Sequence, residues 1–305
     1  MSAWKGQTRG GLTGYRIYIW ILRYMGISFA YFILHFVVFY FVFAAPTASR
    51  EIYRFYRRRM HFNRFKSLVD IYGNYRWFGQ ILIDKLALLS GFEHKFTFDF
   101  EGEEYLRQMA NGGLLISAHM GNWEIAGQLL NRLNKTVNII LFDAEHQHIK
   151  GLLSKTYKNR NVHFIIIKED FTHLLEIRDA LSRGEIVAMH GDRFIPGNKT
   201  VNINFMGEPA PFPIGPVNMA AHFNAPVSFV FAVKESRNHY HFYATPLFKI
   251  EQFNNLAKRN MVLTEIVGIY VKKLEEILRK YPLQWFNYYN FWASSGQTLP
   301  VKEKP

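Results

Sequence analysis

The chain has 305 residues, of which 49% are hydrophobic, 17% aromatic and 20% charged. This composition excludes a mainly disordered chain, because enough apolar side chains are present to bury a core. No cysteine occurs, which excludes disulfides, thiolate metal sites and a cysteine nucleophile. The formal net charge of +13 indicates anionic partners, such as nucleic acid, a phospholipid surface, or an acidic carrier or substrate.

The first 60 residues contain a long apolar run beside a basic excess of nine lysines and arginines against one glutamate. The run, Tyr24 to Ala45, has no Asp, Glu, Lys or Arg. As a helix it would measure about 33 Å, enough to cross a bilayer core. It is too long and starts too late for a cleaved signal peptide. We therefore expect a retained membrane-anchoring helix that spans the bilayer or lies obliquely in one leaflet, with a soluble core helix as the alternative.

A basic cluster follows the apolar run: Arg54, Arg57, Arg58 and Arg59, interleaved with aromatic residues. Such a juxtamembrane cluster is typical of contact with anionic lipid headgroups. No DNA- or RNA-binding module accompanies it, so the sequence predicts a membrane partner and no nucleic acid. We expect two parts, with an anchor and basic juxtamembrane segment in residues 1–60 and a single α/β domain in residues 61–305.

Beyond residue 90, short β-branched or aromatic runs alternate with amphipathic stretches, which is typical of a mostly parallel or mixed sheet flanked by helices. The strands that we expect are residues 96–100, 114–118, 137–142, 162–167, 186–190, 201–205, 227–234 and 239–245. The helices that we expect are residues 103–109, 123–133, 147–157, 172–183, 215–223 and 255–280. The fold class is therefore α/β, with an N-terminal membrane-anchoring helix in addition.

One stretch carries the pattern of a catalytic site. A buried strand runs through Ala118 into His119-Met120-Gly121-Asn122-Trp123-Glu124 and then a helix. Ligands bind at the carboxyl ends of strands in open α/β sheets, so His119 is where a catalytic group is expected. Glu124 would fall in the first helical turn, and the chain can fold back to bring the two side chains together. The pair would form a histidine–carboxylate dyad.

These six residues resemble the His-x4-Asp/Glu motif of the bacterial lipid A secondary (lauroyl/myristoyl-type) acyltransferases, within the glycerolipid acyltransferase superfamily. Further resemblance lies in Gly191-Asp192-Arg193, in residues 201–211 and in residues 212–216. The layout is similar over nearly the whole chain, including the N-terminal apolar segment. The C-terminal residues 284–292 depart from the family pattern, since they hold asparagine and aromatic residues where a basic ending is expected.

The resemblance implies transfer of a fatty acyl group from an acyl-carrier-protein or acyl-coenzyme A thioester to a hydroxyl, or an amine, of a membrane lipid. It also implies the bacterial inner membrane, with the catalytic domain on the cytoplasmic face. His119 would take the proton of the attacking hydroxyl while Glu124 fixes its tautomer. The backbone N–H groups of Gly121 and Asn122 are candidates to hold the oxyanion. The reaction requires no cofactor and no metal.

Three further residues are candidates for the same site. Asp192 and Arg193 follow a strand at the sheet edge, where Arg193 could pair with a phosphate, although a structural ion-pair network is an equal alternative. Glu208 is a candidate second carboxylate, with an ordinary turn residue as the alternative. The remaining histidines, His190 among them, show no spacing that indicates a metal site, and we interpret them as surface or core residues.

The acceptor is most simply a lipid A precursor, and a phospholipid, aminolipid or glycolipid is the alternative. A non-catalytic lipid-binding membrane protein is an alternative from another class, and it would need neither His119 nor Glu124. A serine esterase would need a Gly-x-Ser-x-Gly elbow, which the sequence lacks.

Overall fold

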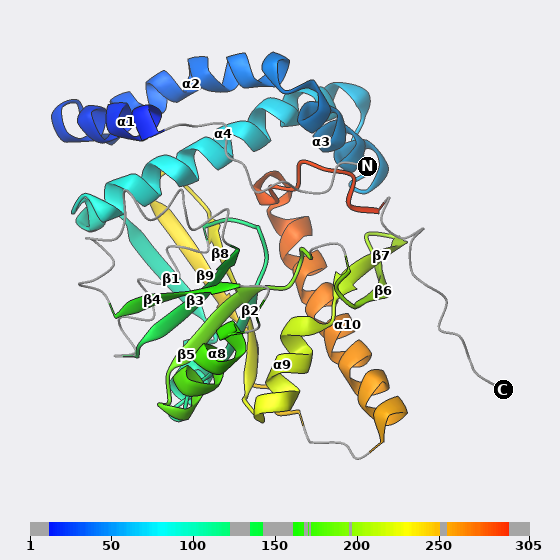
Figure 1. The fold of residues 1–305 in the computed structure, drawn as a ribbon. Coiled ribbons are helices and arrows are strands. Elements are labelled where there is room, and N and C mark those ends of the chain that lie inside the picture. Colours follow the sequence, from blue (N-terminus) through cyan, green and yellow to red (C-terminus); the bar gives the residue numbers. More distant parts are fainter. Residues whose placement is uncertain are drawn as a thin grey trace.

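The computed structural model describes residues 12–122, 135–142, 161–167, 170, 172–194, 197–250 and 255–292. Figure 1 shows these residues as a layer of N-terminal helices above a twisted sheet, with further helices beside the sheet. The two helices expected at residues 123–133 and 147–157 lie outside the described residues, and so does Glu124.

A seven-stranded sheet forms the centre of the fold, in the order β1-β9-β8-β2-β5-β3-β4. Its strands are β1 (Thr97–Glu101), β2 (Gly113–Ser117), β3 (Val137–Phe142), β4 (Val162–Ile167), β5 (Ile186–His190), β8 (Val227–Lys234) and β9 (His239–Ala244). All neighbouring pairs are parallel except β8 and β9. The expected mostly parallel sheet is confirmed. Every residue of β2 is buried, as expected for a central strand between β5 and β8.

A separate two-stranded ribbon was not expected in full. β6 (Thr200–Phe205), an expected strand, pairs antiparallel with β7 (Glu208–Pro213), which was not among the expected strands. Prolines are rare within strands because they cannot donate to the ladder. Pro209, Pro211 and Pro213 occupy alternate positions. In an antiparallel strand alternate residues direct their backbone groups to the same side, so all three prolines can face away from β6 and remove no bond to it.

Helices pack beside the sheet in the order that the sequence predicts. The short α5 (Glu103–Arg107) packs beside β9, and α8 (Thr172–Ser182) packs against β4 and β5. α9 (Gly215–Phe223) packs against β2, while the long α10 (Leu256–Lys280) packs against β8 and α9. Asn255 caps α10 by accepting hydrogen bonds from the backbone N–H groups of Ala257 and Lys258. Two 3₁₀ turns, η1 (Glu93–Lys95) and η2 (Pro282–Gln284), complete the described elements.

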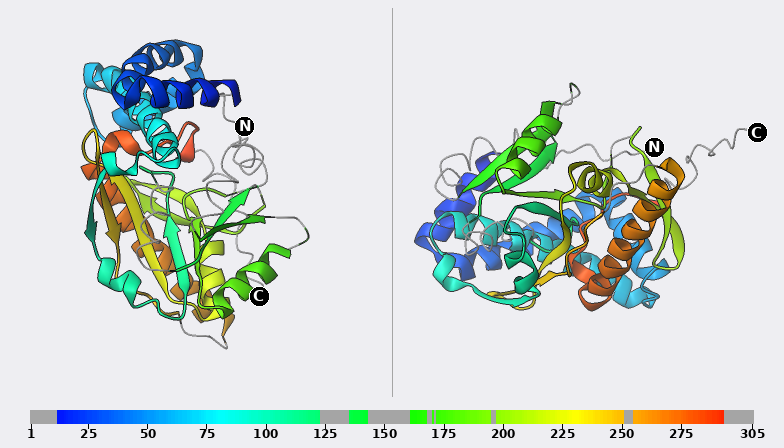
Figure 2. Two further views of the ribbon diagram at one scale, coloured as in Figure 1. Left: turned by 90° about the vertical axis from the view of Figure 1, so that its left-hand side faces the viewer. Right: turned by 90° about the horizontal axis from the view of Figure 1, so that it is seen from below.

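Four helices precede the sheet: α1 (Leu12–Tyr24), α2 (Gly26–Ala44), α3 (Pro46–Arg58) and α4 (Arg64–Leu89). α1, α2 and α3 each pack against α4, and the four form a layer over one end of the sheet (Figures 1 and 2). α2 approaches α4 so closely that a Cβ added at Gly79 would lie 2.3 Å from a methyl carbon of Leu34. α4 was not expected from the sequence, because its apolar residues do not form a clean stripe.

α2 has two different faces. The buried face, which we call the α4 face, consists of Ala30, Tyr31, Leu34 and Val38. The opposite face is aromatic and exposed, and we call it the aromatic face; it consists of Phe32, Phe36, Phe39, Tyr40 and Phe43. By length and composition α2 could cross a membrane. Only 22% of its most apolar 18-residue stretch is buried within the protein. It therefore differs from the fully buried core helix considered as an alternative.

The basic cluster at the end of α3 makes more internal contacts than expected. Arg59 is buried, pairs with Glu208 at 2.5 Å and lies over the ring of Trp292. Arg57 donates to the carbonyl of Phe62, and Arg54 pairs with Glu51 within the helix. The interpretation of all four arginines as headgroup ligands is thus corrected for Arg59, whose guanidinium links α3 to the β6–β7 ribbon.

Candidate active site

The site lies where two central parallel strands end. β2 and β5 are hydrogen-bonded neighbours, and their register pairs Ser117 with His190. His119 follows the end of β2, and Asp192 follows the end of β5. Because both strands run in the same direction, the residues after them meet at one edge of the sheet. This edge faces the N-terminal helices, since Lys234 at the end of β8 contacts Asp84 of α4.

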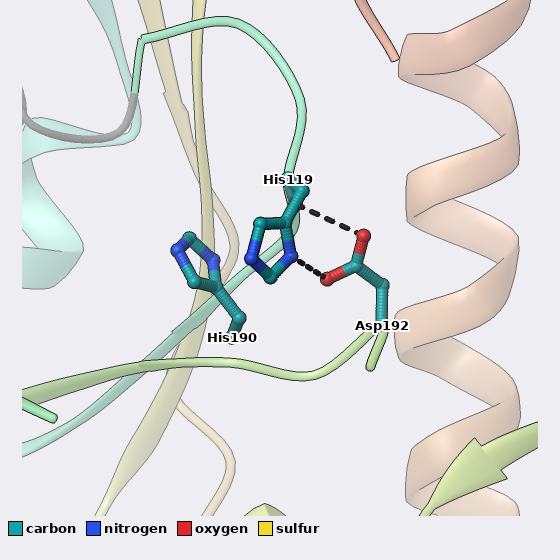
Figure 3. A group of neighbouring side chains, drawn as sticks. All are labelled: His119, His190 and Asp192. Carbon is teal, nitrogen blue, oxygen red and sulfur yellow. Dashed lines mark hydrogen bonds and ion pairs between the residues drawn. The ribbon is translucent and has the colours of Figure 1, made fainter. Parts of the chain in front are cut away.

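His119 and Asp192 are held together by two hydrogen bonds (Figure 3). Nδ1 of His119 lies 2.7 Å from Oδ1 of Asp192, and the backbone N–H of His119 donates to Oδ2 at 3.0 Å. The indole N–H of Trp285 approaches the same Oδ2 at 3.4 Å. The carboxylate is 2% exposed and the imidazole 14% exposed. One buried carboxylate therefore fixes both the ring and the backbone of His119.

The protonation states suit a general base. Burial would raise the pKa of Asp192, but the charges of His119 and Arg193 and the hydrogen bond from His119 lower it well below its usual value. Burial and then the Arg193 cation lower the pKa of His119, with Asp192 opposing them. At neutral pH the carboxylate is ionised and the imidazole neutral. Since an ionised carboxylate can only accept, Nδ1 carries the proton and Nε2 carries the lone pair.

His190 lies beside this pair, a position that was not predicted from the sequence. Its ring centroid is 4.1 Å from that of His119 (Figure 3), and burial lowers its pKa well below the ordinary value. The sequence could have indicated this position, because His190 ends one expected strand and His119 directly follows another. His119, His190 and Asp192 offer ligand atoms within 4.8 Å of one another. A metal cation bound there would have to replace the hydrogen bond between His119 and Asp192, and the positive charge of Arg193 would repel it. The arrangement therefore suits proton transfer better than metal binding.

The turn after His119 is fixed by backbone contacts on two sides. The N–H of Gly121 donates to the carbonyl of Gln284 at 2.9 Å, and the N–H of Asn122 donates to the carbonyl of Ala232 at 2.7 Å. Gly121 has a φ of +61°, and a Cβ there would lie 1.9 Å from the oxygen of Ala232. Both N–H groups are engaged within the fold, so their geometry does not support the oxyanion role expected for them.

The other expected site residues divide between the site and the surface. Arg193 stays at the site, where it donates to the carbonyl of Phe286 at 2.8 Å and influences the pKa values of both histidines. Glu208 is 59% exposed and pairs with Arg59. Glu208 therefore fits the alternative interpretation, a turn residue in a structural ion pair, better than a role as a second catalytic carboxylate.

The expected partner of His119 was Glu124, which lies outside the described residues. Among the described residues, Asp192 binds Nδ1 and so takes the tautomer-fixing role that the sequence analysis assigned to Glu124. The sequence separation of 73 residues explains why motif spacing could not identify this contact. Only the neighbouring positions of β2 and β5 in the sheet bring the two residues together.

A family model described as bacterial lipid A biosynthesis acyltransferase matches residues 12–292. This confirms the resemblance inferred from the motif. Among solved structures, the 1-acyl-sn-glycerophosphate (LPA) acyltransferase PlsC from Thermotoga maritima is similar, with 15% identity and a TM-score of 0.39 over 81% of this chain and 97% of that chain. The curated proteins contain no match.

Proposed function

Because the chain belongs to the bacterial lipid A biosynthesis acyltransferase family, we propose that it transfers a fatty acyl group from an acyl thioester to a hydroxyl, or an amine, of a membrane lipid. A lipid A precursor is the acceptor that we favour. The single observation that carries the chemical part is the hydrogen bond between Nδ1 of His119 and the buried carboxylate of Asp192.

The proposed reaction uses His119 first as a base and then as an acid. Nε2 takes the proton of the acceptor hydroxyl as its oxygen attacks the thioester carbonyl. The tetrahedral intermediate then collapses, the C–S bond breaks, and the departing thiolate receives the proton from His119. Asp192 keeps Nδ1–H in place and stabilises the imidazolium formed between the two steps. Protons and bonds balance, and His119 returns to its starting state.

Glu124 remains part of the proposal as the carboxylate of the His-x4-Glu motif. Since Asp192 already binds Nδ1 of His119, we assign Glu124 a supporting electrostatic role toward the imidazolium. Arg193 is proposed to attract the anionic part of the donor or the acceptor, because a guanidinium binds phosphate oxygens well.

We further propose that the protein docks on the membrane through the aromatic face of α2, with the helix axis in the plane of the surface. The support is that α2 packs along α4 while its aromatic face stays exposed. A spanning α2 would take α4 into the bilayer with it, and α4 contains Arg64, Lys66, Asp70, Arg76, Asp84 and Lys85. Charged residues are costly at that depth, so an interfacial helix is favoured.

The donor is proposed to be acyl-carrier-protein or acyl-coenzyme A, both of which are anionic and match the net charge of +13. These donors place the reaction on the cytoplasmic face of the bacterial inner membrane. A phospholipid, aminolipid or glycolipid acceptor is the alternative within the class. The non-catalytic lipid-binding alternative gives no reason for a histidine bonded to a buried, ionised carboxylate at a sheet edge.

Lipid mass spectrometry tests this proposal. Lipids of a strain lacking the protein are compared with those of strains complemented by the wild type or by His119→Ala. We expect one lipid class to lose an acyl chain in the deletion strain and to regain it only with the wild type. Full restoration by a stably expressed His119→Ala protein would refute the catalytic proposal, and the mass of the changed lipid identifies the acceptor.

A further inference from the structure

A buried polar network lies between the N-terminal helices and the sheet, and the proposed reaction does not use it directly. Its centre is the pair of Asp84 on α4 and Lys234 at the end of β8, whose side chains are 0% exposed. Tyr31 of α2 donates to Oδ1 of Asp84, and Tyr240 of β9 donates to Oδ2. Lys234 also donates to the hydroxyl of Tyr31 at 2.7 Å. Four elements therefore meet at one carboxylate.

One branch of this network reaches the catalytic turn. The side-chain amide of Asn122 donates to the hydroxyl oxygen of Tyr240 at 3.3 Å. Tyr240 gives its own proton to Asp84, so its oxygen is left to accept from Asn122. Burial, and then the charge of Asp84, raise the pKa of Tyr240 well above the ordinary value. Tyr240 therefore keeps its proton at neutral pH, and both hydrogen bonds keep these directions.

Asn122 lies three residues after His119 and is 2% exposed. Main-chain bonds hold this turn to Ala232 and Gln284. The bond to Tyr240 adds a side-chain tether from β9. Gln284 is part of the same hydrogen-bond network. Its side-chain oxygen accepts from the backbone N–H of Lys234 at 2.9 Å, and its side-chain nitrogen donates to the backbone carbonyl of Lys234 at 2.7 Å. The position of the turn is thus connected to the residue that pairs with Asp84.

We propose that Tyr240 is a positioning residue for acyl transfer, whose hydroxyl is held by Asp84 and fixes Asn122 and the turn that carries His119. The proposal rests on the function proposed above. It predicts that the Tyr240 hydroxyl affects the rate of the chemical step and not the binding of substrates. Small displacements of a catalytic group lower the rate strongly, because the reacting atoms must be aligned closely.

Tyr31 provides a matched control. Its hydroxyl binds the same carboxylate as that of Tyr240, and it also contacts Lys234. The Tyr31 hydroxyl also lies 3.3 Å from the carbonyl oxygen of Arg237, and among the described residues it makes no hydrogen bond to Asn122. Tyr31→Phe and Tyr240→Phe each remove one hydroxyl from Asp84. Only Tyr240→Phe removes the tether to the catalytic turn.

The experiment measures acyl transfer from a long-chain acyl-acyl-carrier-protein to a lipid A precursor in detergent micelles, with the full chain. The proteins are the wild type, Tyr240→Phe, Tyr31→Phe, Asn122→Ala, the Tyr240→Phe/Asn122→Ala double variant and His119→Ala. We expect Tyr240→Phe to lower kcat about 10-fold with KM for both substrates unchanged, and Tyr31→Phe to stay within about 2-fold of the wild type. Thermal unfolding should show similar destabilisation by the two single substitutions.

The double variant tests the route of the effect. If Tyr240 acts through Asn122, adding Tyr240→Phe to Asn122→Ala causes no further loss of kcat, and the two effects are not additive. Equal losses in Tyr240→Phe and Tyr31→Phe, or full additivity with Asn122→Ala, would overturn the positioning role. An active His119→Ala protein would instead overturn the proposed function. If the lipid A precursor is not acylated, the acceptor identified by lipid mass spectrometry takes its place in the same assay.

Discussion

Oδ1 and Oδ2 of Asp192 bind two different atoms of His119, the ring Nδ1 at 2.7 Å and the backbone nitrogen at 3.0 Å. The first bond sets the tautomer, and the second fixes the position of the chain that carries the ring. In the proposed reaction, a carboxylate that makes both bonds determines where Nε2 lies relative to the substrates. This explains why a buried charge is maintained at the end of β5.

Asp192→Asn should preserve the fold and remove most of the activity. An asparagine can still accept the backbone hydrogen bond, but its amide can donate to Nδ1 and so favour the tautomer in which Nε2 carries the proton. We expect kcat to fall by about 10³ to 10⁴. The control is Asp179→Asn, which changes an exposed carboxylate on α8. Turnover of Asp192→Asn within 10-fold of the wild type would show that Asp192 does not set the tautomer.

The activity should persist to lower pH than an ordinary histidine base allows. Burial, and then the Arg193 charge, lower the pKa of His119, so the ring stays neutral below the usual value of about 6.5. The acid limb of kcat/KM should therefore lie below pH 6.5, and Arg193→Gln should move it upward because a repelling cation is removed. A limb that Arg193→Gln leaves in place, or moves downward, would contradict this assignment.

The same shifts predict a decrease of stability in mild acid. His119 and His190 have lowered pKa values in the folded chain. Between these values and about 6.5, the unfolded chain binds more protons than the folded chain, so the free energy of unfolding falls as the pH falls through this window. Chemical denaturation at pH 7.5 and at pH 5.5 measures the effect. The decrease should be smaller for His190→Gln, which removes one of the two groups.

Gly121 should tolerate no side chain. Alanine there meets both an unfavourable φ of +61° and the oxygen of Ala232, which would lie 1.9 Å from its Cβ. Gly207 is a matched control, since its φ is +89° but no atom lies within 4 Å of an added Cβ. We expect Gly207→Ala to cost about 1 to 2 kcal/mol of stability and to leave kcat unchanged. Gly121→Ala should cost more stability and should lower kcat about 100-fold, because the turn moves.

The strands were easier to predict than the site. β3, β4, β5 and β8 match the expected bounds, because short apolar runs that end at or directly before a polar or charged residue are typical of strands in a largely parallel sheet. β7 was missed because its alternating prolines obscure a strand, and α4 because it is packed on several sides. His119 was identified from its motif. Its contact with Asp192 depends on the order of strands in the sheet, which local spacing does not specify.

The orientation of α2 on the membrane can be tested with single cysteines, since the natural chain contains none. Tyr24 and Thr47 are exposed and flank the two ends of α2. Tyr24→Cys and Thr47→Cys proteins, bound to anionic phospholipid vesicles, are treated from outside with a membrane-impermeant maleimide. An in-plane helix leaves both ends on the outer side, so we expect both cysteines to react. Protection of one end until the vesicles are lysed would show that α2 spans the bilayer.

The aromatic face provides the second part of this test. Phe36→Ser and Phe39→Ser should each weaken vesicle binding about 10-fold, because burial of a phenylalanine ring contributes about 1.5 to 3 kcal/mol. Leu34→Ala, on the α4 face, should instead lower the free energy of unfolding by about 2 to 5 kcal/mol and leave the vesicle affinity of the folded protein unchanged. These opposite outcomes are expected only if one face of α2 contacts lipid while the other packs on α4. Equal loss of vesicle binding in all three variants would mean that both faces contact lipid and that α2 leaves α4 on the membrane.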